Sequence, residues 1–186
     1  ISTLTFWNVA GMVSPGALGE IGELLILGDY VQTAAGALVF DWSAEGSDML
    51  LVDGSVALGG VAGINPVGGY IPTFGDQRTV LEYTGDRAGE FDGMIDLPGV
   101  LFLSPIYSDG MVALQVLAEN FSDFANFTNP SQAALGSRFD SLRGDPQAGP
   151  VASLFQVIDL LPNGPLEDAF ENLVPHEGFQ LRRTLT

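Results

Sequence analysis

Two residue types are missing from this sequence of 186 residues: it contains no cysteine and no lysine. Without cysteine there can be no disulfide, no thiolate nucleophile and no cysteine-ligated metal. The only basic residues are six arginines against 23 acidic residues, which gives a net charge of −17. Nucleic acids and anionic membranes attract basic surfaces, so this charge argues against both classes of partner.

Long hydrophobic runs are also missing. No apolar run approaches the roughly 18 residues that a membrane-spanning helix needs, and no basic segment precedes an apolar stretch at the start, as in a signal peptide. The chain is nevertheless 46% hydrophobic and only 16% charged, so it can bury a sizeable core. We interpret it as a mature protein, a processed product or a fragment of a longer protein.

Residues 1–117 contain short apolar runs separated by glycine and aspartate turns, a pattern typical of β-strands. The predicted strands are 4–6, 24–27, 37–42, 49–52, 55–58, 61–64, 79–83, 100–103 and 111–117. No helical pattern occurs before residue 118, so the strands must form an antiparallel sandwich or a solenoid. A solenoid of this length would have roughly five coils if each takes about 20–25 residues. The side chains expected to line its interior include Leu25, Leu27, Val39, Leu51 and Leu58.

Residues 118–186 are expected to form a polar linker and a short α-helical tail. Apolar residues recur there at helical spacing, and a proline stands near the start of each repeat. The predicted helices are 131–143, 151–161 and 165–174. Their apolar stripes should pack on the end of the solenoid or on each other. Two domains, 1–117 and 118–186, are therefore expected.

Several motifs follow one another in a definite order. They are GMVSPG at 11–16, IGEL at 21–24, GDY at 28–30, SDMLLV at 47–52, a glycine pair at 59–60, VGGY at 67–70, FDG at 91–93 and TNPSQAAL at 128–135. This order resembles the C-terminal passenger region of bacterial autotransporters, which combines the end of a β-helix with a helical linker. The resemblance spans residues 11–175 and does not extend to the membrane barrel of that family. It implies a mainly β fold, a right-handed parallel β-helix (solenoid) of a few coils followed by a short α-helical tail.

The resemblance implies a non-catalytic, secreted or cell-surface segment that serves as a structural stalk and folding seed. It places the chain outside a bacterial outer membrane, with a possible outer-membrane barrel beyond its C-terminus and no membrane insertion of the segment itself. Two other functions remain open: a surface adhesin or filament-forming subunit, and a polysaccharide-cleaving β-helix enzyme.

Candidate catalytic residues are sparse. Nucleophilic catalysis needs a base beside a serine, but the only histidine is His176 in the tail, which we expect to be exposed. Glycoside cleavage needs two acids flanking the bond. The close pairs, Asp92 and Asp96, Glu20 and Glu23, and Asp86 and Glu90, stand near glycines and are expected to be solvated turn charges. A β-helix lyase commonly adds a basic residue, for which Arg78 and Arg87 are the candidates, both in an expected loop.

No site residue is therefore assigned from the sequence: we expect no catalytic residue, no cofactor and no metal. The chain has neither an Asp-x-Asp-x-Asp-Gly loop nor a nonapeptide calcium repeat, although adventitious calcium binding stays open. Aromatic residues could form a ligand platform, but we expect them to pack in the core or at coil corners. These residues are Phe6, Trp7, Tyr30, Phe40, Trp42 and Tyr70.

The first seven residues, Ile-Ser-Thr-Leu-Thr-Phe-Trp, are β-prone, uncharged and free of proline. Solenoids usually cover their terminal edge with a polar or helical cap, and this segment has the opposite character. We therefore expect a partner at the N-terminal edge, either upstream coils of the same protein or another copy of the chain.

Overall fold

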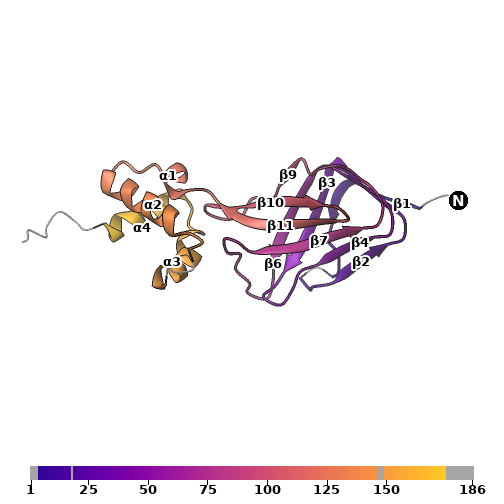
Figure 1. The fold of residues 1–186 in the computed structure, drawn as a ribbon, viewed down its shortest axis with the longest axis horizontal. Helices are drawn as coiled ribbons and strands as arrows, with labels where there is room; N and C mark the ends of the chain where they lie inside the picture. The colour runs from indigo at the N-terminus through magenta and orange to yellow at the C-terminus, as the bar shows by residue number, and fades with distance from the viewer. Residues whose placement is uncertain (1–3, 18, 146–148, 175–186) are drawn as a thin grey trace, which may run out of the picture. The chain divides into compact units, whose positions relative to one another are not determined.

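The computed structural model describes residues 4–17, 19–145 and 149–174. The chain divides into two compact units, which are best considered separately (Figure 1). The β unit comprises Ile1–Leu97 and Leu101–Leu117, and the helical unit comprises Pro98–Val100 and Ala118–Thr186.

The first sheet of the β unit is parallel, and its longest strand, β3, lies at its centre. On one side β3 pairs with β1 along most of its length, and on the other side it pairs with β5 and then with β6. β8 and β9 extend the sheet beyond β5 and β6. The strands are β1 (Thr5–Val13), β3 (Asp29–Trp42), β5 (Val56–Leu58), β6 (Val61–Pro66), β8 (Arg87–Gly89) and β9 (Gly93–Met94).

The second sheet is mixed and has the order β10-β11-β7-β4-β2. β2, β4 and β7 are parallel neighbours, whereas β11 runs antiparallel to β7 (Figure 1). The chain passes back and forth between the two sheets, although β5 and β6, and later β8 and β9, follow each other within the first sheet. β10 and β11 are consecutive strands of the second sheet, joined by a turn at Asp109-Gly110. The strands are β2 (Glu23–Ile26), β4 (Met49–Val52), β7 (Gln77–Tyr83), β10 (Leu101–Ser108) and β11 (Met111–Ala118).

The prediction of a mainly β, right-handed parallel β-helix is wrong. The described part of the chain is mixed α/β, with about 22% helix and 42% strand, and its strands form two sheets, one parallel and one mixed. An alternating apolar pattern is the same in parallel and antiparallel strands, so it could not reveal that β11 turns back on β7. That reversal requires a tight turn, which Gly110 permits at a φ of 75°.

A column of glycines lets successive turns of the β unit approach one another closely. A β-carbon added at Gly54 would clash with the carbonyl oxygen of Gly28, and one added at Gly28 would clash with the carbonyl oxygen of Leu4. Gly85 stands above Gly54 and donates its N–H to the Gly54 carbonyl at 2.8 Å. The column ends at Leu4, where a side chain replaces the hydrogen of glycine.

The core of the β unit combines long aliphatic side chains with three fully buried aromatic residues, Tyr30, Phe40 and Trp42. Val39 and Leu58 are buried as predicted, but Leu25 and Leu27 are exposed and Ile26 is buried instead. Residues 24–27 are all apolar, so their sequence does not indicate which alternate positions face inward. Trp7, which was expected to pack in the core or at a coil corner, is 60% exposed.

The described residues of the helical unit form four helices, α1 (Phe121–Phe124), α2 (Pro130–Leu142), α3 (Pro150–Ile158) and α4 (Asn163–Leu173). The last three begin within two residues of the predicted starts, and Asn129 caps α2 by accepting from the Ser131 N–H at 2.8 Å. Their apolar stripes meet in one cluster, with the phenylalanines at 121, 139, 155 and 170 in contact. None of the described helices is long and apolar enough to span a membrane.

Candidate functional site

The outermost strands β1 and β2 form what we call the N-terminal edge, residues 4–13 and 23–27. β1 pairs with β3 alone, and β2 pairs with β4 alone, among the described residues. Most of the large apolar side chains on this edge are exposed: Leu4, Phe6, Trp7, Val9, Met12, Leu25 and Leu27. A soluble protein rarely leaves so many together without a partner.

A shallow apolar cavity of about 340 Å³ lies on this edge, lined by residues 4–6 of the first segment and 24–27 of the second. Its lining includes the ring of Phe6, which stacks on buried Tyr30 with centroids 5.9 Å apart. Phe6 is thus the last member of a stack and keeps its other side open. Burial raises the pKa of Tyr30 to about 12, so its hydroxyl stays a neutral donor.

A chain of buried side-chain amides begins at the same edge. Gln32 donates to the carbonyl oxygens of Gly59 (2.7 Å) and Val61 (3.1 Å), and it accepts from the Tyr30 hydroxyl at 2.8 Å. Asn8 donates to the Gln32 amide oxygen at 3.3 Å from 24 positions earlier in the chain. This polar chain fixes the register of β1 on β3 because a shift of one residue would leave these buried groups unpaired.

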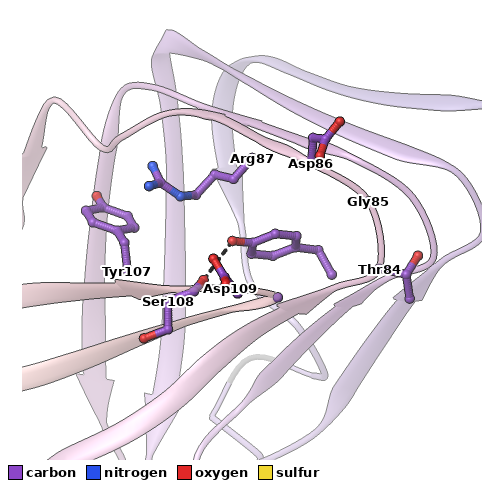
Figure 2. A pocket seen from close by; sticks show the side chains of 9 residues that line it. Thr84, Gly85, Asp86, Arg87, Tyr107, Ser108 and Asp109 are labelled. Carbon is purple, nitrogen blue, oxygen red and sulfur yellow. Dashed lines mark hydrogen bonds between the residues drawn. The ribbon is translucent and has the colours of Figure 1, made fainter.

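A second cavity, of about 480 Å³, has a polar lining and lies where β7 and β8 meet the β10–β11 turn (Figure 2). Its walls come from two segments, 83–87 and 107–110. The Tyr83 hydroxyl donates to the Ser108 carbonyl at 2.9 Å. Figure 2 shows the side chains of Arg87 and Tyr107 on one side of this space and those of Asp86 and Thr84 on the other.

Arg87 is held in this cavity by its neighbours. Its guanidinium lies 4.4 Å from the centroid of the Tyr107 ring and 3.8 Å from the Glu90 carboxylate. The Tyr107 hydroxyl accepts from the Phe91 N–H at 2.9 Å, and burial is the largest of the effects that raise the pKa of Tyr107. Arg87 is the first residue of β8, so it lies on a strand and not in the loop expected from the sequence.

Arg78, the other arginine considered for catalysis, also lies on a strand, in β7. Its guanidinium lies 5.4 Å from the Trp42 ring centroid and 5.5 Å from the Tyr70 ring centroid, and it donates to the Ser43 carbonyl at 2.7 Å. These contacts use the cation to join β7 to the end of β3. Arg78 and Arg87 thus lie in separate environments and do not form one site.

The acidic pairs do not form two-carboxylate sites. Asp92 accepts from the Gly60 N–H at 2.5 Å, whereas Asp96 is exposed. Glu20 and Glu23 are exposed, and of the third pair Asp86 lines the polar cavity while Glu90 pairs with Arg87. His176 lies outside the described residues.

Two carboxylates of the β unit, Asp41 and Asp48, are fully buried, which their sequence context did not predict. Asp41 accepts from the Gly19 N–H and the Asn65 amide, each at 2.6 Å, and Asp48 accepts from the Gly22 N–H at 2.8 Å. Burial is the main effect that raises the pKa of Asp48, and the charge of Asp41 adds to it. These carboxylates fasten the loop before β2 to the end of β3, which is a structural role.

No group of three or more His, Cys, Asp or Glu side chains in the described part of the chain could hold a metal ion. The two arrangements that remain are the N-terminal edge, which can pair with another strand, and the polar cavity. Comparison with protein-family models and with curated proteins finds no match to this chain.

Proposed function

We propose that this chain is a non-catalytic structural segment of an exported, autotransporter-type protein, and that its N-terminal edge seeds folding by pairing with a further parallel strand. The observation that carries the proposal is β1, an outer strand whose apolar side chains are exposed. Proteins usually protect such an edge with charges or proline. Residues 5–13 contain neither.

The chemistry of the edge supports a strand as its partner. An added strand would satisfy the unpaired backbone groups of β1 and cover its apolar side chains. Phe6 ends an aromatic stack, and Asn8 ends a chain of amides, so the edge repeats the features through which β1 itself pairs with β3. The absence of charge on β1 supports the same partner. No charged residue occurs between positions 4 and 19, although the whole chain has a net charge of −17, so a second strand could approach β1 without repulsion from this segment.

A tandem repeat tests the proposal. The first four residues of β1 pair with β3 at a spacing of 24 residues. A variant in which residues 1–28 are followed by residues 5–186 would place a second β1 at that spacing ahead of the original one. The repeat also places glycine ahead of the original Thr5, which removes the Leu4 side chain from the glycine column. We expect the added strand to be protected from amide hydrogen exchange.

Val9→Lys in the original β1 is the matched disruption, since Val9 is exposed and a lysine on an edge strand opposes pairing with a further strand. It should abolish protection of the added strand and leave β3 protected. The control Glu45→Lys changes the charge at an exposed turn and should have no effect. An added strand that exchanges freely without Val9→Lys would contradict strand pairing at this edge.

The seeding role is tested separately by refolding. If it is correct, β1 and β3 should become protected before the added strand during refolding of the tandem variant, as followed by pulsed hydrogen exchange. Simultaneous or reversed protection would refute seeding while leaving strand pairing intact. Assemblies of the unaltered protein that Val9→Lys dissolves would instead identify a second copy as the partner.

A further inference from the structure

The polar cavity has no part in strand pairing, and its lining is unusual for a structural segment. It has a volume of about 480 Å³, within the roughly 300–1,000 Å³ of small-ligand sites. Most such sites are mainly apolar, whereas this one is lined by hydroxyl, carboxylate and guanidinium groups. Two glycines, Gly85 and Gly110, expose backbone in its wall.

The cavity contains both hydrogen-bond acceptors and hydrogen-bond donors. Asp86 and Asp109 provide carboxylate acceptors, and among the described residues neither side chain forms a hydrogen bond or an ion pair. The hydroxyl of Tyr83 donates to the Ser108 carbonyl and so keeps its lone pairs for a ligand. Donors come from the Ser108 hydroxyl and from the N–H groups of Arg87.

Charge narrows the class of ligand. An anion would meet two carboxylates in a chain of net charge −17. A cation would meet the guanidinium of Arg87, which the Tyr107 ring and Glu90 hold at one side of the cavity. A neutral ligand with several hydroxyl groups meets neither repulsion, since each hydroxyl can donate to a carboxylate or accept from the guanidinium.

We propose that this cavity, between residues 83–87 and 107–110, is a binding site for a neutral saccharide. The carboxylates of Asp86 and Asp109 accept from adjacent sugar hydroxyls, and Arg87 donates to a sugar oxygen. Hydrogen bonds to charged groups are stronger than those between neutral groups, so the three side chains supply most of the selectivity.

The test uses the full chain labelled with ¹⁵N and four neutral disaccharides as probes: maltose, cellobiose, lactose and N,N′-diacetylchitobiose. At least one of them should shift the amide resonances of Gly85 and Gly110 in a saturable manner. The double variant Asp86→Asn/Asp109→Asn should weaken that binding by about tenfold, because two charge-assisted hydrogen bonds become neutral ones.

The matched control is Asp96→Asn, which alters an exposed carboxylate of the same unit outside the cavity lining and should bind like the unaltered protein. Unchanged resonances of Gly85 and Gly110 with all four sugars would overturn the proposal. So would saturable binding of propylammonium or acetate at the same residues without binding of any sugar. Equal weakening by Asp96→Asn would overturn it as well, because the effect would then be one of overall charge.

Discussion

The guanidinium of Arg143 lies 2.8 Å from the carboxylate of Asp159, and the two side chains are only 5% and 4% exposed. Arg143 also lies 4.2 Å from the centroid of the Phe121 ring and donates to the Glu119 carbonyl at 2.7 Å. The helical unit thus places an ion pair against its phenylalanine cluster. Such a pair adds little net stability but is costly to break, because the remaining charge stays buried.

We expect Arg143→Met to lower the free energy of unfolding of the helical unit by about 3–5 kcal/mol, since it leaves Asp159 buried without its cation. The double variant Arg143→Met/Asp159→Asn should recover part of that loss. Urea denaturation followed by far-ultraviolet circular dichroism measures both. A double variant no more stable than the single one would show that Arg143 acts through packing alone.

The pH dependence of the same pair follows from its burial. Desolvation raises the pKa of Asp159 above 3.8, against the opposing effect of Arg143. A carboxyl with a raised folded-state pKa contributes stability that is complete below 3.8 and lost as pH rises through the folded value. Without Arg143 that pKa rises further, so Arg143→Met should be more destabilising at pH 7 than at pH 4. Equal losses at both pH values would contradict this.

Gln32 should be more important for stability than any other polar side chain of the β unit. Gln32→Met keeps the length of the side chain but removes the side-chain partner of the Tyr30 hydroxyl and of two carbonyl groups. It also removes one of the two acceptors of the Asn8 amide, which still donates to the Ala37 carbonyl at 3.0 Å. We expect the free energy of unfolding to fall by about 2–4 kcal/mol, as measured by thermal or urea unfolding. Each buried group left unsatisfied costs about 1–3 kcal/mol, and partial relaxation of the structure reduces the sum. Asn8→Ala, at the open edge, should cost less than half as much.

Gly60 and Gly68 have the same φ of 62°, which makes them a matched pair. A β-carbon at Gly60 would meet the carbonyl oxygen of Gly36 far inside van der Waals contact, whereas one at Gly68 would meet nothing within 4 Å. Gly68→Ala should therefore cost only the left-handed backbone strain of about 1–2 kcal/mol. Gly60→Ala should cost several kcal/mol more, because the clashing atoms are backbone. Similar melting temperatures for the two variants would argue against the close approach.

The two tryptophans provide an optical check on the edge. Trp7 is 60% exposed and Trp42 is 0% exposed. Acrylamide should quench only part of the native fluorescence, and Trp7→Phe should remove the quenchable part and leave a blue-shifted emission from Trp42. Complete quenching of the variant would show that Trp42 is accessible.

Local pattern was sufficient to predict most strands and all three longer helices. The periodicity of a single strand or helix depends only on which of its faces is buried, so it can be recognised locally. Examples are the strand runs 49–52 and 111–117 and the helices that contain Phe139, Phe155 and Phe170. The pattern did not reveal β8 and β9, which are only three and two residues long and contain little apolar surface. It also missed the first half of β3, where buried Gln32 interrupts the apolar alternation.

The candidate sites were harder to predict, because each depends on residues far apart in sequence. The polar cavity joins Arg87 to Tyr107 and Asp109 through the turn that reverses β11, and that reversal was not predicted. The buried carboxylates Asp41 and Asp48 look like ordinary turn residues until the Gly19 and Gly22 N–H groups are placed on them. The exposed N-terminal edge was the part that composition alone could indicate, since it follows from an absence of charge.

The parallel pairing of β1 with β3 also bears on how the β unit would respond to mechanical force. Tension applied between the start of β1 and the end of β3 would pull the two strands in opposite directions along their length, because they run the same way. The evenly spaced hydrogen bonds of a parallel pair would then share the load in shear and would not open one at a time. If the chain is part of a stalk under tension, this geometry would make β1 a strong point of attachment.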